Sequence, residues 1–287
     1  MNRWLRKGEN WGPGAPRREY SAAHWDKPLR WNAKAEREGK RLRVFPSVCD
    51  PFDNEVPEHW RTRFFELIAD TPHIDWLLLT KRIGNAATMI DAATDSNALP
   101  VWPWPHVWLG ATIVNQEEAD RDIPKLLATP ARVRFLSIEP MLGDIRLGSF
   151  LQRSPSAAFA AGRVTATMPN WTRIGSTAID WVIAGGESGP KARPAHPDWF
   201  RSLRDECAVA GVPFHFKQWG EWTPGENVER VRGTVDTAFL DDDTWRIYRL
   251  NLATDHGHID DQPDLYRIGK KAAGSLLDGI EHNAFPS

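Results

Sequence analysis

The sequence predicts an α/β fold in which parallel strands alternate with helices to form a partial or complete (β/α) barrel. Six short apolar runs have the composition of buried strands, helical patterns lie between them, and polar residues follow every run. Four of the five intervals between run starts are 26 to 33 residues, close to the usual length of a strand–helix unit, and the fifth is 47 residues because it holds an insertion. They cover residues 44–48, 76–80, 107–112, 133–138, 180–185 and 213–217.

Helices are predicted between the runs because apolar residues recur there three and four positions apart, as at 60–68 and 199–207. Asn115 followed by Glu118 has the spacing of a capping box and predicts another helix start. Gly211 is of the residue type that ends helices. We divide the chain into an irregular basic lead-in with a polar helical stretch near its end, a barrel core and a C-terminal appendage, at residues 1–43, 44–222 and 223–287.

Two further elements are expected in the appendage. Residues 245–250 suggest a small hairpin, and residues 266–279 suggest a short basic amphipathic helix. Within the core, the Ser/Ala-rich stretch at 154–170 is interpreted as a surface excursion.

Composition narrows the class of protein. The chain has 287 residues, 41% of them hydrophobic and 26% charged, as in a soluble globular protein. A net charge of −2 gives no bulk basic footprint for nucleic acid, although a local basic groove stays open. No apolar run is long enough for a membrane span, and the first residues lack a signal-peptide core, so we expect a cytoplasmic protein. Most of the 15 tryptophans are expected to pack in the interior.

The candidate site lies where the predicted strands end, because binding groups in parallel α/β folds gather at the carboxyl ends of the strands. Every run is followed by polar groups, which favours a barrel over an open sheet with a single switch point. The candidate binding residues are Asp50, Lys81, Arg82, Thr112, Asn115, Ser137, Glu139, Gly185, Gly186, Glu187, Ser188, Lys217 and Gln218.

Several of these candidates also have structural explanations. Asn115 is a strong N-cap type, and Asp50 could simply begin a turn. Lys81 and Arg82 could be a solvated pair or could hold a phosphate or carboxylate.

Glu139 and Glu187 are the two carboxylates that most strongly suggest function. A carboxylate at the end of an apolar strand costs desolvation energy unless it has a cationic partner or a ligand. A partner from Lys81, Arg82 or Lys217 would make the pair structural.

Three other features give little evidence about function. The Gly185–Gly186 pair is not the dinucleotide fingerprint. Cys49 and Cys207 are expected to be buried thiols, too few for a self-contained zinc or iron–sulfur site. His256 and His258 could bind a metal or lie in a polar loop.

Eight segments together resemble a known family over nearly the whole chain. They are residues 11–18, 47–57, 75–82, 107–116, 134–143, 180–194, 212–222 and 266–279, among them SVCDPFDNEVP, RFLSIEPMLG and DWVIAGGESGPKARP. They resemble the phage-associated three-cysteine-motif family of unknown function, named after mycobacteriophage gene products thirty-seven and sixty-eight. That family is similar to radical S-adenosylmethionine enzymes. The resemblance implies a partial barrel and, in a full-length form, a [4Fe-4S] cluster and S-adenosylmethionine.

The expected C-x6-C-x2-C motif is absent from this sequence, and we expect the first barrel strand to be missing with it. Either the chain is truncated, which we favour, or this member has lost its cluster. The GGE at Gly185–Glu187 follows the fifth visible strand, so we do not assign it the cofactor role that a similar segment has after the second strand of radical enzymes.

The function that the resemblance implies is therefore the binding barrel of a radical S-adenosylmethionine-like phage or prophage protein. Without the cysteine segment, this chain is not expected to perform the radical step. Glu139 and Glu187 would bind polar groups, and Lys81, Arg82 and Lys217 would hold anionic ones. Thr112, Ser137 and Gln218 would orient them. A small-molecule or nucleotide-like substrate and a phage-encoded partner protein are possible partners. The alternatives are a non-catalytic binding or accessory protein, and a cluster-free barrel enzyme acting on an anionic substrate.

Overall fold

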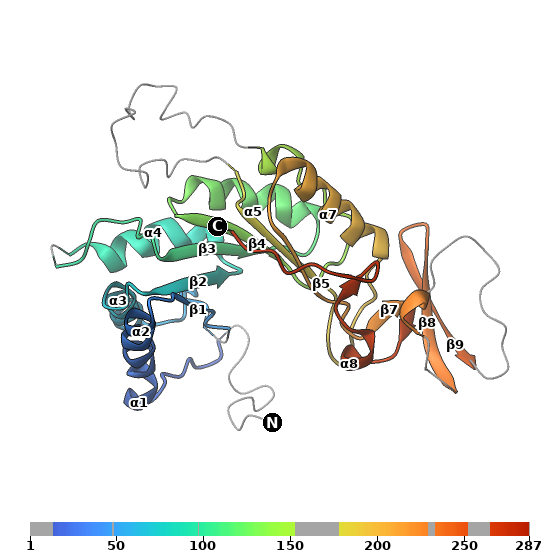
Figure 1. Cartoon of the computed structure of the whole chain (residues 1–287), viewed down its shortest axis with the longest axis horizontal. Helices are drawn as coiled ribbons and strands as arrows, with labels where there is room; N and C mark the ends of the chain where they lie inside the picture. The colour runs from blue at the N-terminus through green and yellow to red at the C-terminus, as the bar shows by residue number, and fades with distance from the viewer. Residues whose placement is uncertain are drawn as a thin grey trace.

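A parallel sheet of six strands, curved into a half-barrel, forms the body of the molecule (Figure 1). The computed structural model describes residues 14–47, 49–96, 98–152, 178–228, 233–251 and 265–286. Neighbouring strands follow one another in the sequence, so each connection adds the next strand on the same side. The strands are β1 (Leu42–Val44), β2 (Ile74–Thr80), β3 (Val107–Thr112), β4 (Val133–Ile138), β5 (Trp181–Gly185) and β6 (Phe214–Gln218).

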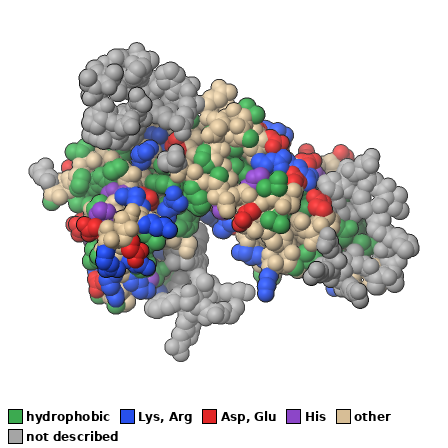
Figure 2. All heavy atoms as spheres, in the orientation of Figure 1, with side chains coloured by type: hydrophobic (Ala, Val, Ile, Leu, Met, Phe, Trp, Pro, Cys, Tyr) green, Lys and Arg blue, Asp and Glu red, His purple; other side chains and the backbone are tan. Residues whose placement is uncertain are grey.

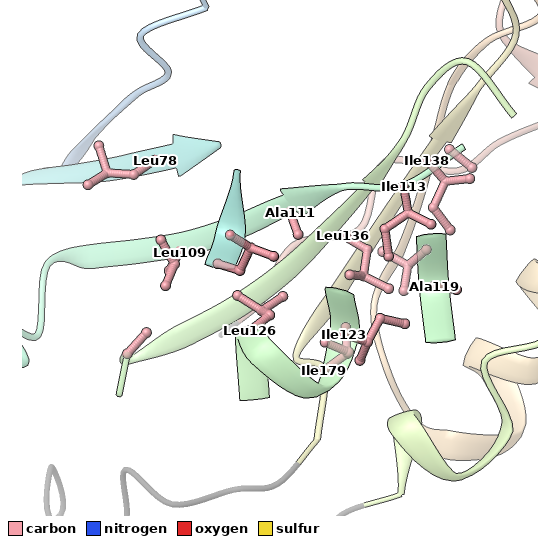
Figure 3. Packing of buried hydrophobic residues seen from close by; sticks show 14 of the residues in the cluster. Leu78, Leu109, Ala111, Ile113, Ala119, Ile123, Leu126, Leu136, Ile138 and Ile179 are labelled. Atoms are coloured by element: carbon pink, nitrogen blue, oxygen red, sulfur yellow. The ribbon is translucent and has the colours of Figure 1, made fainter. Parts of the chain in front are cut away.

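Helices cover the outer face of this sheet. Figure 3 shows Ala119, Ile123 and Leu126 of α5 packed against apolar side chains of β3 and β4. This contact belongs to the main hydrophobic core, which takes alternate residues from each strand. The helices that precede or connect the strands are α1 (Ala22–Trp25), α2 (Lys27–Glu38), α3 (Glu58–Ala69), α4 (Ile83–Thr94), α5 (Gln116–Ala128), the 3-10 turn η1 (Gly148–Leu151) and α7 (Pro197–Ala210).

The inner, concave face has a smaller core of its own. It is built from the other set of alternate strand residues, which are Leu77, Trp108, Val133, Phe135, Trp181 and Ile183. Gly110 makes room for it: a Cβ at Gly110 would lie 2.4 Å from the Phe135 ring. Both faces of the sheet are therefore apolar along most of their length, as the near-continuous apolar runs predict.

The C-terminal part adds a four-stranded antiparallel sheet in the order β7-β10-β8-β9. The chain then returns to the half-barrel, where the Trp219 indole donates to the carbonyl of Leu276 and Leu277 is fully buried in the main core. The elements are β7 (Trp222–Pro224), η3 (Gly225–Asn227), β8 (Thr234–Asp241), β9 (Thr244–Asn251), β10 (Leu265–Arg267), α8 (Lys270–Ala273), β11 (Leu276–Leu277) and β12 (Ile280–Glu281).

The α/β prediction is confirmed as a parallel half-barrel with helices, and the runs at 107–112 and 133–138 match β3 and β4. The first run is displaced: β1 ends at Val44, because the chain turns at residues 45–47. The polar helical stretch before it is present as α2, and the hairpin around 245–250 as β8 and β9.

The predicted helix at 266–279 is wrong. Only α8 is helical there, and it is bounded by Gly269 and Gly274, whose φ angles of 86° and 73° lie outside the helical region. The expectations for residues 154–170, His256 and His258 concern chain outside the described residues. Among the described residues, no helix is both long and apolar enough to cross a membrane.

Candidate functional site

A connected polar network lies where β4, β5 and β6 end. Lys217 Nζ donates to Glu139 Oε2 at 2.7 Å, and Gln218 Nε2 donates to Glu139 Oε1 at 2.7 Å. The same amide nitrogen lies 3.3 Å from Ser188 Oγ. The Glu139 side chain is 18% exposed and Lys217 51%, so the network reaches the surface. We call Thr112, Ser137, Glu139, Gly185, Ser188, Lys217 and Gln218 the strand-end site.

An irregularity in the sheet explains why two consecutive residues of β6 both reach Glu139. Successive strand residues normally point to opposite faces. Here the register shifts between Ala184 and Gly185, and Gly185 pairs with Gln218. Such a shift re-aims the side chains of one strand, and it brings Gln218 to the same carboxylate as Lys217.

Glycines let the neighbouring backbone come close. A Cβ at Gly186 would lie 1.8 Å from the Trp219 carbonyl oxygen, and one at Gly220 would lie 2.1 Å from that of Glu187. The two segments are joined by hydrogen bonds from Gly186 N to Gln218 O and from Glu221 N to Glu187 O, each 2.9 Å. The Gly185–Gly186 pair therefore serves strand-to-strand contact.

Two hydroxyls beside this network have no hydrogen-bond partner among the described residues. Thr112 and Ser137 are paired in the β3–β4 ladder and are only 8% and 7% exposed. They follow Trp108 and Phe135 on the inner face by four and two positions, so both side chains point to that face. Their oxygen atoms are not fully enclosed, so water or a polar ligand can reach both hydroxyls.

A second polar cluster ties the β1 end to the β2 end. Asp50 Oδ1 accepts from Thr80 Oγ1 at 2.8 Å, and Asp50 Oδ2 accepts from Arg82 Nη1 at 3.0 Å. Asp50 Oδ1 also accepts from the Phe52 amide, so the residue both begins a turn and forms an ion pair. The Lys81 ammonium is exposed and has no acidic partner among the described residues.

Asp53 extends this second cluster to the N-terminal segment. Arg17 donates to Asp53 Oδ2 at 2.9 Å through Nε and also approaches Glu55. Burial alone would raise the pKa of Asp53. The Glu55 amide, the Arg17 hydrogen bond and the Arg82 charge outweigh burial and lower that pKa. The carboxylate is therefore held in its charged form.

Glu187 has a partner that the sequence did not suggest. Its two carboxylate oxygens accept from Arg193 Nε at 2.8 Å and from Nη2 at 2.9 Å, and the Arg193 amide adds a third bond at 2.7 Å. The Arg193 hydrogen bond, against the opposing effect of burial, lowers the pKa of Glu187. Glu187 thus pairs with an arginine of the loop that follows it. The cationic partner of Glu139 is Lys217, one of the three basic residues considered from the sequence.

Asn115 is the N-cap of α5. Its side-chain oxygen accepts from the Glu118 amide at 2.9 Å, and Glu118 Oε2 accepts from the Val114 amide at 3.0 Å. This reciprocal arrangement satisfies two amides at the helix start. The Asn115 side chain is therefore committed to the helix.

The two cysteines do not assemble a metal site. Cys207 lies in α7 within the outer core, whereas Cys49 lies beside Asp50. Burial raises the pKa of each thiol to about 12, with Asp50 adding to the effect at Cys49. In the part of the chain that is described, no group of three His, Cys, Asp or Glu side chains is arranged to hold a metal ion.

Sequence reasoning missed the residues that neutralise or position the candidates. Arg193 binds Glu187 six residues away, whereas Arg17 binds Asp53 and Glu221 accepts from the Gly189 amide at 3.0 Å, 36 and 32 residues away in the chain. None of them follows one of the predicted apolar runs directly, and none has a recognisable spacing to its partner. Figure 2 shows basic and acidic side chains interspersed over this face of the molecule.

The fold and the site define an α/β half-barrel protein with a charged and polar site at its strand ends. The family described as "Protein of unknown function (DUF5131)" matches residues 2–286, and the chain belongs to that family. No curated protein and no solved structure matches the sequence of this chain.

Proposed function

We propose that this chain is the binding half-barrel of a radical S-adenosylmethionine-like phage or prophage protein. Its strand-end site takes a small polar ligand that bears hydroxyl or amino groups together with an anionic group. The observation that carries the proposal is the Lys217–Glu139–Gln218–Ser188 network beside the unpartnered hydroxyls of Thr112 and Ser137.

The network supplies both signs of charge to a ligand. The Lys217 ammonium has three donors, of which Glu139 uses one, so it can also hold an anionic group. Glu139 can accept from a ligand hydroxyl or amino group because a carboxylate has about four acceptor positions. Thr112 and Ser137 can donate or accept, and they orient a neutral part of the ligand.

The residues present do not fit a [4Fe-4S] cluster. Such a cluster needs cysteine thiolates, and the two thiols lie apart with raised pKa values. We therefore assign ligand binding to this chain and derive no radical step from it. The support for the radical-enzyme relationship is the strand-end resemblance together with the parallel half-barrel.

Titration calorimetry with S-adenosylmethionine, S-adenosylhomocysteine and ATP tests the proposal. We expect saturable binding of an adenosylated amino acid. Glu139→Gln should weaken it about tenfold or more, because a hydrogen bond to a charged group contributes about 1.5–3 kcal/mol. Thr112→Val, which keeps the shape and removes the hydroxyl, should weaken it less.

Glu38→Gln is the matched control, since Glu38 lies on α2 in an exposed pair with Lys34. Glu187→Gln tests whether the carboxylate that Arg193 binds also contacts the ligand, and unchanged affinity would exclude such a contact. Binding of ATP but of neither adenosylated amino acid would favour the alternative that the protein is a cluster-free barrel enzyme acting on an anionic substrate. No saturable binding of any probe would overturn the proposal.

A further inference from the structure

The last residues of the chain cross the open side of the half-barrel. The Phe216 amide donates to the His282 carbonyl at 2.9 Å, and His215 forms a β-bridge with Asn283. Further on, the Trp181 indole donates to the Ala284 carbonyl at 2.8 Å. We call residues 282–285 the C-terminal strap.

Phe285 carries the strap from one edge of the sheet to the other. Its ring centre lies 4.8 Å from that of Trp181 on β5, and the Arg43 guanidinium of β1 lies 4.6 Å from the Phe285 ring centre. Strands β1 and β6 are the two edges of the sheet. The Phe285 ring centre also lies 5.7 Å from that of His215 on β6, so one aromatic side chain contacts both edges, where a complete barrel would have hydrogen-bonded strands.

The two halves of the C-terminal segment are held very differently. Before the strap, Leu277 is fully buried, and Asp278 is bound by Arg201 and Arg204. Within the strap, Asn283 and Ala284 are exposed, and Phe285 is 42% exposed. The strap is therefore largely exposed, whereas the segment before it is buried and bound by ion pairs.

Two orphaned polar atoms weaken the docked strap. His215 Nδ1 and His282 Nε2 are buried and have no hydrogen-bond partner among the described residues. Each such atom gives up its hydration without gaining a hydrogen bond in return. Detachment of the strap would return water to both, so the docked state carries a cost that the detached state avoids.

We propose that the C-terminal strap is a reversible closure of the half-barrel that regulates the strand-end site. β6 connects the two, because His215 contacts the Phe285 ring while Lys217 and Gln218, two and three residues on, hold Glu139. The regulation of the strand-end site rests on the proposed function, whereas the opening and closing of the strap does not.

Acid favours the open state. Burial lowers the pKa of His215, and Lys217 lowers it further, while Glu281 and Glu139 act against them; Arg43 also faces the strap across Phe285. Since the closed state has the lower pKa, protonation stabilises the open state as the pH falls towards the ordinary histidine value.

Hydrogen exchange of the Phe216 amide and the Trp181 indole, followed by NMR in the full chain, tests the strap without any ligand. After correction for intrinsic rates, we expect several-fold faster exchange at pH 5.5 than at pH 7.5. His215→Gln should abolish the pH dependence, and Phe285→Ala should give fast exchange at both values. Ile280→Ala, an exposed change outside the strap, is the control.

Slow exchange that depends neither on pH nor on Phe285 would show a fixed part of the inner core and overturn the proposal. If the strap opens as expected, the affinity of the adenosylated probe should differ between the parent chain and Phe285→Ala. Equal affinities with an opening strap would reject regulation alone, while absence of binding in both would reject the proposed function alone.

Discussion

At the scale of single residues, Gly186 has the tightest surroundings of the described glycines, because its backbone touches that of Trp219. A side chain there would meet a carbonyl oxygen of a neighbouring strand end, which cannot move without disturbing the strand-end site. Such a clash belongs to the few mechanisms that produce large losses of stability.

We expect Gly186→Ala to lower the free energy of unfolding by about 4 kcal/mol or more, measured by denaturant titration. Gly143→Ala is the matched control, since a Cβ at Gly143 meets nothing within 4 Å. Equal stability of the two variants would show that the close approach of Gly186 and Trp219 is not maintained in solution.

Glu139 and Glu187 look alike in the sequence, since each follows an apolar strand. Their surroundings differ because Glu187 is enclosed by Arg193, six residues later, while Glu139 is shared by two residues of β6. Desolvation cost predicts that each carboxylate needs a partner. It does not predict which one, because the partners are set by loop geometry and by the register shift between β5 and β6.

At the scale of elements, the start of α5 can be predicted from local sequence. Its start is visible in the sequence because Asn115 and Glu118 satisfy helix amides with their own side chains, independently of tertiary contacts. The opposite case is residues 266–279, where a helical pattern is cut to four residues in α8 by glycines on both sides.

Asn115→Ala should destabilise the protein by about 1 kcal/mol, the typical cost of losing an N-cap side chain. Thermal or chemical unfolding measures it. Asn115→Asp should retain most of the stability, because Asp caps equally well and carries a charge favourable to a helix start. A large loss in both variants would mean that the Asn115 amide group itself has a further role.

At the scale of the whole molecule, the C-terminal segment holds to the half-barrel through Asp278. Asp278 has a φ of 54° in the β11–β12 turn, and Arg201 Nη2 lies 2.7 Å from its carboxylate. The Arg201 hydrogen bond, against burial and with Arg204 assisting, lowers the pKa of Asp278. A lowered acid pKa stabilises the fold above the unfolded value near 3.9, and this contribution is lost as the pH falls through the folded pKa.

Asp278→Asn should therefore lower the free energy of unfolding at pH 7 by about 1 kcal/mol, a modest value for a partly exposed pair. Asn suits the left-handed turn, so the backbone can stay as it is while the charge and one of the two acceptor oxygens are lost. The difference from the parent should shrink as the pH is lowered towards about 2. Asp91→Asn, on the exposed face of α4, is the control; a difference that persists in acid would argue against the ion pair.

The sequence by itself determined the parallel α/β class, the positions of β3 and β4 and the polar strand ends. It could do so because both faces of such strands are buried, leaving apolar runs that stop where the polar residues begin. Only the tertiary structure decided that six strands form a half-barrel, that Lys217 and Gln218 share Glu139, and that residues 282–285 cross its open side. These features depend on sheet curvature, a register shift and contacts between residues far apart in the chain, none of which leaves a local pattern.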